Sequence, residues 1–454
     1  MDFKDKKVTV AGAGISGVAA AELLTNAGAI VTIYDGNASL SPEDVLVRLG
    51  TDIRGQFVFG EFTEALSRET ELLVISPGIP VDLPFVEELK KKGVPVIGEI
   101  ELAYLFAKGK LIAVTGTNGK TTTTALTGAI MRTYFEHVLV VGNIGTPYTA
   151  LVDSTTESSV TVAEISSFQL ETVHTFRPDV SMILNITPDH LNRHHTMENY
   201  IAAKEAIAAN QTAGDVCILN YEDERLRAFG EQVKSRVLYF SSARALEEGL
   251  YVEDGIIFYA HEGVAECICK VDELNIIGRH NHENAMAAIA AGIVMGVPTE
   301  LIHKALCEFQ AVEHRVEYVA TKRGVRYYND SKGTNPDAAI QAIRAMTGNT
   351  LLIAGGYDKG SEYDEWIEAF DGKVGYLVLL GQTREKIAEA ARNHGIENII
   401  LCDSFLEAMQ FCTAHAKEGD TVLLSPACAS WGMFRNYEER GRIFKEYVHS
   451  LSDN

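Results

Sequence analysis

The sequence predicts an α/β protein of three domains. Short apolar runs alternate with helical stretches along most of its 454 residues, as in parallel sheets built from βαβ units. One series of runs ends near residue 98, a second begins at Leu111, and a third runs from about residue 312 to the end. The length agrees, because a domain commonly holds ~150 residues. We therefore expect domains at 1–98, 99–311 and 312–454.

The amino-acid composition limits which classes of function the chain can have. Hydrophobic residues at 46% and charged residues at 22% are typical of soluble globular chains. The formal net charge of −22 disfavours nucleic acid and anionic membrane surfaces as partners. The seven cysteines are scattered, which favours reduced thiols in a cytoplasm. No signal peptide and no apolar stretch long enough to span a membrane is evident, so we expect a cytoplasmic protein. Separately, we expect a monomer that acts on small molecules.

The first domain carries a glycine-rich turn. Gly12, Gly14 and Gly17 follow the apolar run KVTVA and open a helix, so backbone amides at the helix start can receive a diphosphate. Asp35 ends the next apolar run, where such folds place a ribose-binding carboxylate. A nicotinamide or flavin enzyme is one interpretation. The alternative is that the glycines only let a helix pack tightly on the sheet.

A second glycine-rich turn lies in LIAVTGTNGKTTTTALTGAI, residues 111–130, after an expected connecting helix at 99–110. Val114 stands where the strict P-loop spacing needs glycine. The turn keeps Gly116, Gly119, Lys120 and Thr121 between a strand and a helix. Amides and an ammonium can cradle phosphates there, and a hydroxyl can ligate Mg²⁺.

The stretch 249–274 breaks the alternating pattern. Its strand-like runs are separated by Asp254-Gly255 and Glu262-Gly263, dipeptides suited to tight hairpin turns. We expect a small antiparallel appendage on the central domain.

Two apolar runs of the central domain end in groups that can bind a cation. VAEISSFQLE places Glu164 at the end of one run, and ILNITPDHLNRHH places Asp189 and His190 after another. The carboxyl ends of parallel strands meet at the ligand-binding edge of a sheet, so these groups could hold a divalent cation there. We expect His194 and His195, in contrast, to be capping or solvated residues.

Other polar residues stand out less. Lys204 resembles an ordinary solvent-facing lysine of a helix, Asn281 and Asn284 suit a helix cap, and Arg315 suits a surface strand. The stretch YNDSKGTNPDA at 328–338 is richer, because Asp330, Lys332, Thr334 and Asn335 crowd a loop before a helix.

Along essentially the whole chain, the sequence resembles the Mur ligase family of ATP-dependent amide-forming enzymes. The resemblance rests on eight motifs that occur in the family's order: TGTNGKTTT, ISSFQLE, ITPDHLNRH, AAK, GRHNHENA, EHRVE, NDSKGTNP and SPACASWGMFRNYEERG. The resemblance implies an N-terminal Rossmann-like sheet, a central P-loop ATPase-like domain and a C-terminal Rossmann-like domain. SPACASWGMFRNYEERG, with GAGISG and SPGIP, is most similar to the members that add D-glutamate.

The resemblance also implies a residue set for each ligand. The set for the UDP-linked substrate is Gly14, Ile15, Ser16, Gly17, Asp35, Ser76 and Asn143. The set for ATP is Gly116, Thr117, Asn118, Gly119, Lys120, Thr121, Thr122, Asn281, Asn284, Arg315 and Asp330. The set for D-glutamate is Lys332, Thr334, Lys359, Ser430 and Tyr437. The chain departs from some members at Gly36, Asn37 and Tyr437, where those members have threonine, arginine and phenylalanine.

For catalysis the resemblance points to Lys120, His190, Lys204 and Arg315. Thr121, Glu164, His190 and a carbamylated Lys204 would lie at Mg²⁺, with a second Mg²⁺ expected. The implied reaction joins D-glutamate to UDP-N-acetylmuramoyl-L-alanine through an acyl phosphate, in peptidoglycan precursor synthesis. One glycine turn would then bind UDP and the other ATP.

Four alternatives remain open. Two belong to the same superfamily. One is an L-alanine-adding ligase, against which the motifs SPGIP and SPACASWGMF argue. The other is a folylpolyglutamate synthase, which is disfavoured because its P-loop normally lies near the N-terminus. The remaining two, from other classes, are a nicotinamide oxidoreductase with a regulatory ATP module and a non-catalytic nucleotide-binding protein. The last would not need Glu164, His190 and Lys204 together.

Overall fold

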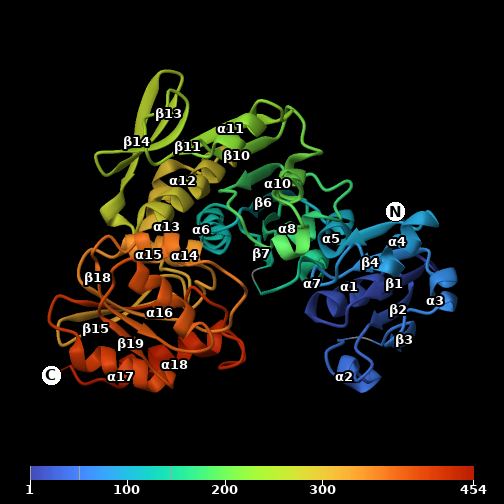
Figure 1. Ribbon diagram of the computed structural model, residues 1–454. Coiled ribbons are helices and arrows are strands. Elements are labelled where there is room, and N and C mark those ends of the chain that lie inside the picture. The colour runs from blue at the N-terminus through green and yellow to red at the C-terminus, as the bar shows by residue number, and fades with distance from the viewer. Residues whose placement is uncertain (1, 51, 144, 454) are drawn as a thin grey trace. The chain divides into compact units, whose positions relative to one another are not determined.

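The structure is a computed structural model that describes residues 2–50, 52–143 and 145–453. Its strands form three sheets connected by helices (Figure 1). The chain divides into two compact units. The first unit holds Met1–Val271 and Glu283–Leu306, and the second holds Asp272–His282 and Cys307–Asn454. The first two sheets belong to the first unit and the third sheet to the second unit, which confirms the predicted α/β class.

The N-terminal sheet is parallel throughout, with the order β3-β2-β1-β4-β5. Its strands are β1 (Lys7–Ala11), β2 (Ile30–Asp35), β3 (Gly55–Phe59), β4 (Leu72–Ile75) and β5 (Val96–Gly98). Its helices are α1 (Ile15–Asn26), α2 (Pro42–Leu46), α3 (Glu64–Glu69) and α4 (Pro84–Lys91). Strand β4 (LLVI) is fully buried, and β1 (KVTVA) is buried except for Lys7, as expected for strands covered on both faces.

Helix α5 (Glu99–Phe106) connects the first sheet to the central sheet, as the sequence predicted. Two of its carboxylates are buried against loops of the central sheet. Glu99 accepts hydrogen bonds from the backbone N–H and hydroxyl of Thr149 at 2.7 and 2.9 Å. Glu101 accepts from the backbone N–H groups of His174, Thr175 and Phe176. These bonds fix α5 to the central part of the unit, because an unpaired buried carboxylate is costly.

The central sheet has the order β14-β13-β12-β11-β10-β9-β6-β8-β7. Its parallel strands are β6 (Lys110–Thr115), β7 (Val138–Gly142), β8 (Val160–Glu164), β9 (Val180–Ile183), β10 (Val216–Asn220), β11 (Arg236–Ser241) and β12 (Gly249–Glu253). The helices of this region are α6 (Lys120–Arg132), α7 (Tyr148–Leu151), α8 (Ser167–Leu170), α9 (Leu191–His194), α10 (Met197–Glu205), α11 (Glu224–Gly230), α12 (Arg279–Val294) and α13 (Thr299–Glu308).

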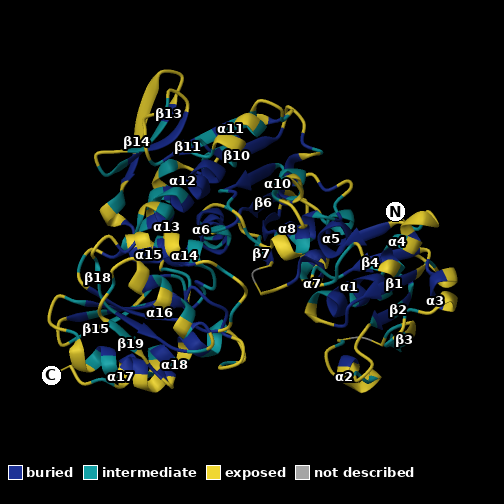
Figure 2. Ribbon diagram, in the orientation of Figure 1, coloured by how far each residue is buried: buried dark blue, intermediate teal, exposed yellow. Residues whose placement is uncertain are grey.

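The predicted antiparallel segment extends this sheet at one edge. Strands β13 (Ile256–His261) and β14 (Val264–Lys270) pair antiparallel beyond β12. Asp254 and Gly255 both have positive φ at the first turn, and so do Glu262 and Gly263 at the second. This conformation suits tight hairpins and confirms both predicted turns. Strand β14 is largely exposed (Figure 2).

The third sheet has the order β15-β16-β20-β17-β18-β19. Its strands are β15 (Glu317–Lys322), β16 (Val325–Asn329), β17 (Thr350–Ala354), β18 (Val374–Leu379), β19 (Ile399–Leu401) and β20 (Thr421–Leu424), of which only β15 runs antiparallel to its neighbour among the described residues. Its helices are α14 (Pro336–Ala345), α15 (Asp364–Glu368), α16 (Arg384–Asn393), α17 (Phe405–His415) and α18 (Tyr437–Ser450). Within the described ranges, none of the helices has the length and apolar character that crossing a membrane requires.

Candidate active site

The turn at Gly116–Lys120 joins β6 to α6 and has the geometry of a phosphate site. Gly116 and Gly119 have φ of +152° and +86°, a region that favours glycine. Lys120 folds back over the turn, and its Nζ donates to the carbonyls of Gly116 and Thr117, both at 2.8 Å. A Cβ on Gly119 would lie 2.2 Å from Asn284 Oδ1, so the turn needs glycine there. The start of α6 therefore presents backbone amides and an ammonium together.

Lys204 reaches the same turn, contrary to the expectation of a solvent-facing lysine. Its side chain is buried on α10, and its Nζ donates to the Gly116 carbonyl at 2.7 Å. Burial, together with the nearby charge of Lys120, lowers the pKa of Lys204 well below its ordinary value. A lowered pKa favours the neutral amine over the ammonium form. The neutral amine can add carbon dioxide to become a carbamate.

The carboxylate of Glu164, at the end of β8, has one oxygen available for a ligand. Its Oε1 accepts from Asn143 Nδ2 at 2.8 Å. Its Oε2 is buried and has no hydrogen-bond partner among the residues that the structure describes. A buried carboxylate oxygen is costly without a partner, and a divalent cation is a suitable one. Glu164 thus fits the metal role that the sequence suggested for it.

His190 follows β9 at the same edge of the sheet. It adopts φ of +53°, its backbone N–H donates to Asp189 Oδ1, and its ring lies 4.9 Å from that of Phe168. About half of its side chain is exposed. The ring is thus held in place while remaining accessible to a ligand.

His194 corrects the expectation of a capping or solvated residue. It is buried, with Nε2 at 2.9 Å from Ser167 Oγ and Nδ1 at 3.2 Å from Glu171 Oε1. His195 agrees with the expectation, since it is exposed and paired with the exposed Asp82. The sequence pattern does not distinguish the two histidines.

The first glycine turn, between β1 and α1, is very tight. A Cβ on Gly17 would lie 1.8 Å from the carbonyl oxygen of Gly12, whereas a Cβ on Gly14 would meet nothing within 4 Å. Gly14 caps α1 without a side-chain hydrogen bond, which leaves the helix start open to an anion. Asp35 accepts from the backbone N–H of Ala13 at 2.9 Å, so this carboxylate also braces the turn.

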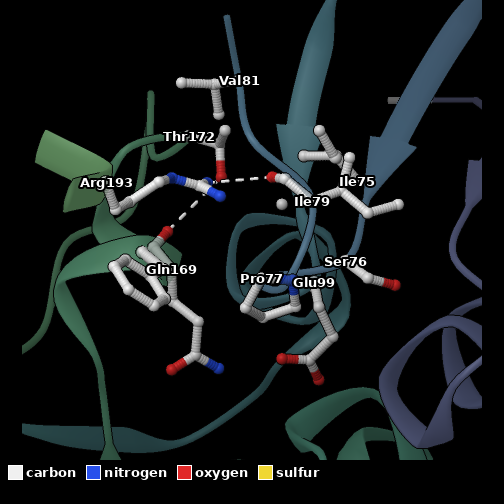
Figure 3. A pocket seen from close by; sticks show the side chains of 11 residues that line it. Ile75, Ser76, Pro77, Ile79, Val81, Glu99, Gln169, Thr172 and Arg193 are labelled. Carbon is white, nitrogen blue, oxygen red and sulfur yellow. Dashed lines mark hydrogen bonds between the residues drawn. The ribbon is translucent and has the colours of Figure 1, made fainter. Parts of the chain in front are cut away.

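A narrow crevice in the first unit lies between the segment after β4 and α8 (Figure 3). Ser76, Ile79 and Arg193 are among its lining residues. Ser76 Oγ is buried and has no hydrogen-bond partner in the described part of the chain. Arg193 Nη2 donates to the Ile79 carbonyl at 2.9 Å and to Glu171 Oε2 at 2.7 Å. The predicted substrate residue Ser76 therefore shares a crevice with Arg193, which the sequence motifs did not single out.

In the second unit, the charge of Arg315 acts on the buried carboxyl group of Asp330. Asp330 accepts from Ser425 Oγ at 2.8 Å and from the backbone N–H of Val316 at 3.3 Å. Burial raises the pKa of Asp330 to about 7, although Arg315 opposes the rise. Arg315 Nε is buried and without a hydrogen-bond partner among the described residues. Arg315 precedes β15 and is not the surface strand residue that its sequence alone suggested.

Three of the predicted amino-acid-binding residues follow the carboxyl ends of strands in the third sheet. Thr334, Lys359 and Ser430 lie in the loops after β16, β17 and β20, which are neighbouring strands. Lys332 Nζ lies 5.5 Å from the ring centre of Tyr437, a cation–π distance. Asn281 also belongs to this unit, where its Nδ2 donates to the Ile277 carbonyl, as expected of a residue that braces a helix start.

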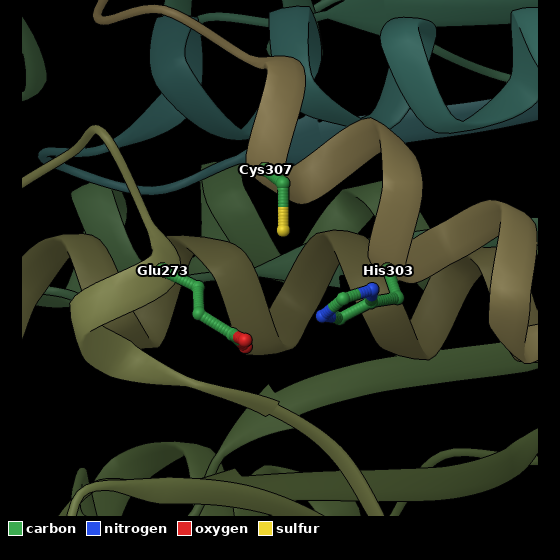
Figure 4. Close-up of side chains that lie close together, drawn as sticks. All are labelled: Glu273, His303 and Cys307. Atoms are coloured by element: carbon green, nitrogen blue, oxygen red, sulfur yellow. The ribbon is translucent and has the colours of Figure 1, made fainter.

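Glu273, His303 and Cys307 carry groups that bind metals (Figure 4). Glu273 and Cys307 belong to the second unit and His303 to the first. We assign no site to them.

These features define a class of protein: a nucleotide-binding α/β chain with two glycine turns, each between a parallel strand and a helix, and with a carboxylate at the end of β8 that has an oxygen available for a ligand. Three family descriptions match the chain, namely "Mur ligase MurD-like, N-terminal domain" at residues 6–98, "Mur ligase middle domain" at 114–292 and "Mur ligase, glutamate ligase domain" at 314–428. The chain belongs to the Mur ligase family.

Curated relatives are similar along the whole chain. The chain is 59% identical over 453 residues to the UDP-N-acetylmuramoylalanine--D-glutamate ligase of Lachnoclostridium phytofermentans, with 100% of both chains covered. It is 55% identical to the ligase of the same name from Lachnospira eligens, with 99% of this chain and 100% of the other covered.

Solved structures confirm the fold. The UDP-N-acetylmuramate-alanine ligase MurC of Thermotoga maritima has a TM-score of 0.61 at 19% identity, with 98% of this chain and 99% of that chain covered. The MurF ligase of Thermotoga maritima, in complex with ADP, has a TM-score of 0.60 at 16% identity, with 92% and 95% covered.

Proposed function

We propose that the protein is an ATP-dependent ligase that adds D-glutamate to UDP-N-acetylmuramoyl-L-alanine through an acyl phosphate, releasing ADP and phosphate. The observation that carries the proposal is the pair of glycine turns within one unit, each opening a helix after a parallel strand of its own sheet. Two phosphate-bearing ligands require two such turns. The names and full-length identity of the curated relatives support D-glutamate as the added amino acid.

A carboxylate needs activation because its negative charge resists attack and an oxide is a poor leaving group. Phosphoryl transfer from ATP supplies a better leaving group, and the neutral amine of D-glutamate then attacks the acyl carbon. Lys120 lies over the phosphate turn and would neutralise charge on the transferring group. By resemblance, Arg315 of the second unit would do the same, and its unpaired Nε–H suits that role.

Mg²⁺ would be held by Glu164 Oε2, with Thr121, His190 and a carbamylated Lys204 nearby. When bound, the ion would neutralise phosphate charge. The unpartnered oxygen of Glu164 supports this assignment, and so does the lowered pKa of Lys204. Lys332, Thr334, Lys359, Ser430 and Tyr437 are donors suited to the two carboxylates of D-glutamate.

In this proposal each of the two glycine turns binds a different nucleotide. The turn at Gly12–Gly17 and Ser76 would bind the UDP part, and the turn at Gly116–Lys120 would bind ATP. We also propose that the protein is a cytoplasmic monomer. The seven free cysteines support the cytoplasmic location.

Phosphate release from ATP tests the proposal. The assay contains UDP-N-acetylmuramoyl-L-alanine and one amino acid at a time. Release is expected only with D-glutamate, and release with L-alanine or L-lysine instead would overturn the assignment.

Absorbance at the nicotinamide wavelength, with the same substrates, is expected to stay constant. A change there would favour the oxidoreductase alternative.

A further inference from the structure

Tyr200 lies inside the first unit, one helical turn before Lys204 on α10. It is among the largest fully buried side chains. Residues one turn apart share a helix face, and Lys204 Nζ lies 4.6 Å from the centre of the Tyr200 ring. The ring therefore packs against the ammonium group that donates to the Gly116 carbonyl.

The hydroxyl of Tyr200 also reaches the phosphate turn, at Thr117. Tyr200 Oη lies 2.9 Å from Thr117 Oγ1. Thr117 Oγ1 donates its single hydrogen to the Thr187 carbonyl at 3.1 Å and accepts from the Thr187 N–H at 3.0 Å. A threonine hydroxyl has one hydrogen and two acceptor positions, so the remaining bond has Tyr200 as donor.

This bond completes the hydrogen bonding of Thr117, a residue whose backbone forms the phosphate turn. Further supports of the turn come from the segment after β9. Thr117 N–H donates to the Asn185 carbonyl at 3.0 Å, and Asn118 N–H donates to Asn185 Oδ1 at 2.9 Å. From α10, Tyr200 supports the turn at Thr117 and Lys204 supports it at Gly116.

We propose that Tyr200 is a positioning residue that holds the phosphate turn, through Thr117, in register with Lys204. One side chain thereby couples the two lysine-bearing elements that meet at the Gly116 carbonyl. A turn whose amides are fixed before the ligand arrives binds phosphates without first losing conformational freedom. The inference rests on the proposed function, since it takes this turn to be the ATP site.

Tyr200→Phe removes only the hydroxyl and keeps the ring against Lys204. We expect the Kd for ADP, measured by titration calorimetry, and the KM for ATP to rise about three- to tenfold, the range of one hydrogen bond. The KM values for the UDP-linked substrate and D-glutamate should stay within about twofold. Tyr148→Phe is the matched control, because Tyr148 is an equally buried tyrosine on α7 and should leave ADP binding unchanged.

The partner residue gives an independent test that does not need the tyrosine variant to fold. Thr117→Val removes the hydroxyl with little change in shape, and Thr117→Ser retains it. We expect weaker ADP binding with valine and recovery with serine. In a double-mutant cycle, Tyr200→Phe should add little to Thr117→Val, because the two variants break the same bond.

Two results would overturn the inference: additive effects in the cycle, or unchanged ADP binding in Tyr200→Phe. Melting temperatures of both tyrosine variants separate a general loss of stability from loss of positioning, since only Tyr200→Phe should weaken ADP binding.

The proposed function can fail independently of this inference. It fails if the wild-type protein releases no phosphate with D-glutamate, an outcome that leaves the ADP-binding comparison intact.

Discussion

The Nζ atoms of Lys120 and Lys204 both donate to the carbonyl oxygen of Gly116, at 2.8 and 2.7 Å. Two ammonium groups on one acceptor repel each other, and this repulsion adds to burial in lowering the pKa of Lys204. Conversion of Lys204 to a carbamate would replace this repulsion with attraction. The arrangement therefore favours the chemical modification that the sequence resemblance implies.

Lys204→Ala should be nearly inactive in phosphate release, because no carbamate can form. Added short carboxylates should partly restore activity by occupying the vacated position. Lys110→Ala, which removes an exposed lysine of β6, is the control and should behave like the wild type. Wild-type turnover in Lys204→Ala would exclude the carbamate role.

Glu164→Gln should lower phosphate release at least about 100-fold, because a neutral amide is a weaker ligand for a divalent cation than a carboxylate. The variant should keep its fold, since glutamine Oε1 can still accept from Asn143. Binding of Mn²⁺, followed by electron paramagnetic resonance in the presence of ADP, should weaken in parallel. Tight Mn²⁺ binding by Glu164→Gln would place the metal elsewhere.

Gly17→Ala should abolish binding of UDP, because the new Cβ would collide with the Gly12 carbonyl and distort the first turn. ADP binding should survive, since its turn belongs to another sheet. Gly14→Ala should fold like the wild type, because its Cβ enters open space. Calorimetric titration of each variant with UDP and with ADP checks all of these outcomes.

Arg193→Ala should raise the KM for the UDP-linked substrate about tenfold, with a smaller effect on the KM for ATP, because Arg193 lines the crevice beside Ser76. The free energy of unfolding should fall by about 1–3 kcal/mol, since Glu171 and the Ile79 carbonyl lose a charged donor. His195→Ala, which breaks an exposed pair, should change both quantities far less. Equal effects of the two variants would remove Arg193 from the substrate site.

Asp330 should make the protein less stable as pH rises from about 4 to about 7. Its pKa is raised from the ordinary value of 3.8 to about 7 in the folded protein. Over that interval the unfolded chain ionises while the folded chain keeps its proton, so ionisation favours unfolding. Above about pH 7, Asp330 is ionised in both the folded and the unfolded chain, and the loss of folding stability stays constant.

Asp330→Asn removes this dependence. The free energy of unfolding of the variant, relative to wild type, should therefore increase between about pH 4 and 7 and then level off. Denaturant unfolding at several pH values measures the difference. The exposed Asp371→Asn is the control. A difference for Asp330→Asn that does not vary with pH would contradict the raised pKa.

The sequence predicted the layers of the fold well because buried parallel strands are continuous apolar runs. KVTVA and the run that ends at Glu164 became β1 and β8, each fully buried or nearly so. Strand β3 was not singled out, since GQFVF has only a short apolar run and lies at a sheet edge, where it is mostly half-buried or exposed.

The site was predicted less completely, because single residues do not reveal their burial. Lys204 resembles any helical lysine, and only the docking of α10 against the phosphate turn buries it. Arg193 lies inside the motif ITPDHLNRH and Tyr200 just before AAK, but neither residue type reveals a role. Their roles depend on contacts with Ile79 and Thr117, which are far away along the chain.

The buried carboxylates of α5 determine where the N-terminal sheet can be detached. Glu99 and Glu101 engage backbone groups in the loops of the central sheet, so these loops hold α5 in place. A truncated chain that starts at Glu99 should keep this helix docked. One that starts after Phe106 would leave the N–H groups of those loops without their carboxylate acceptors and should be prone to aggregate.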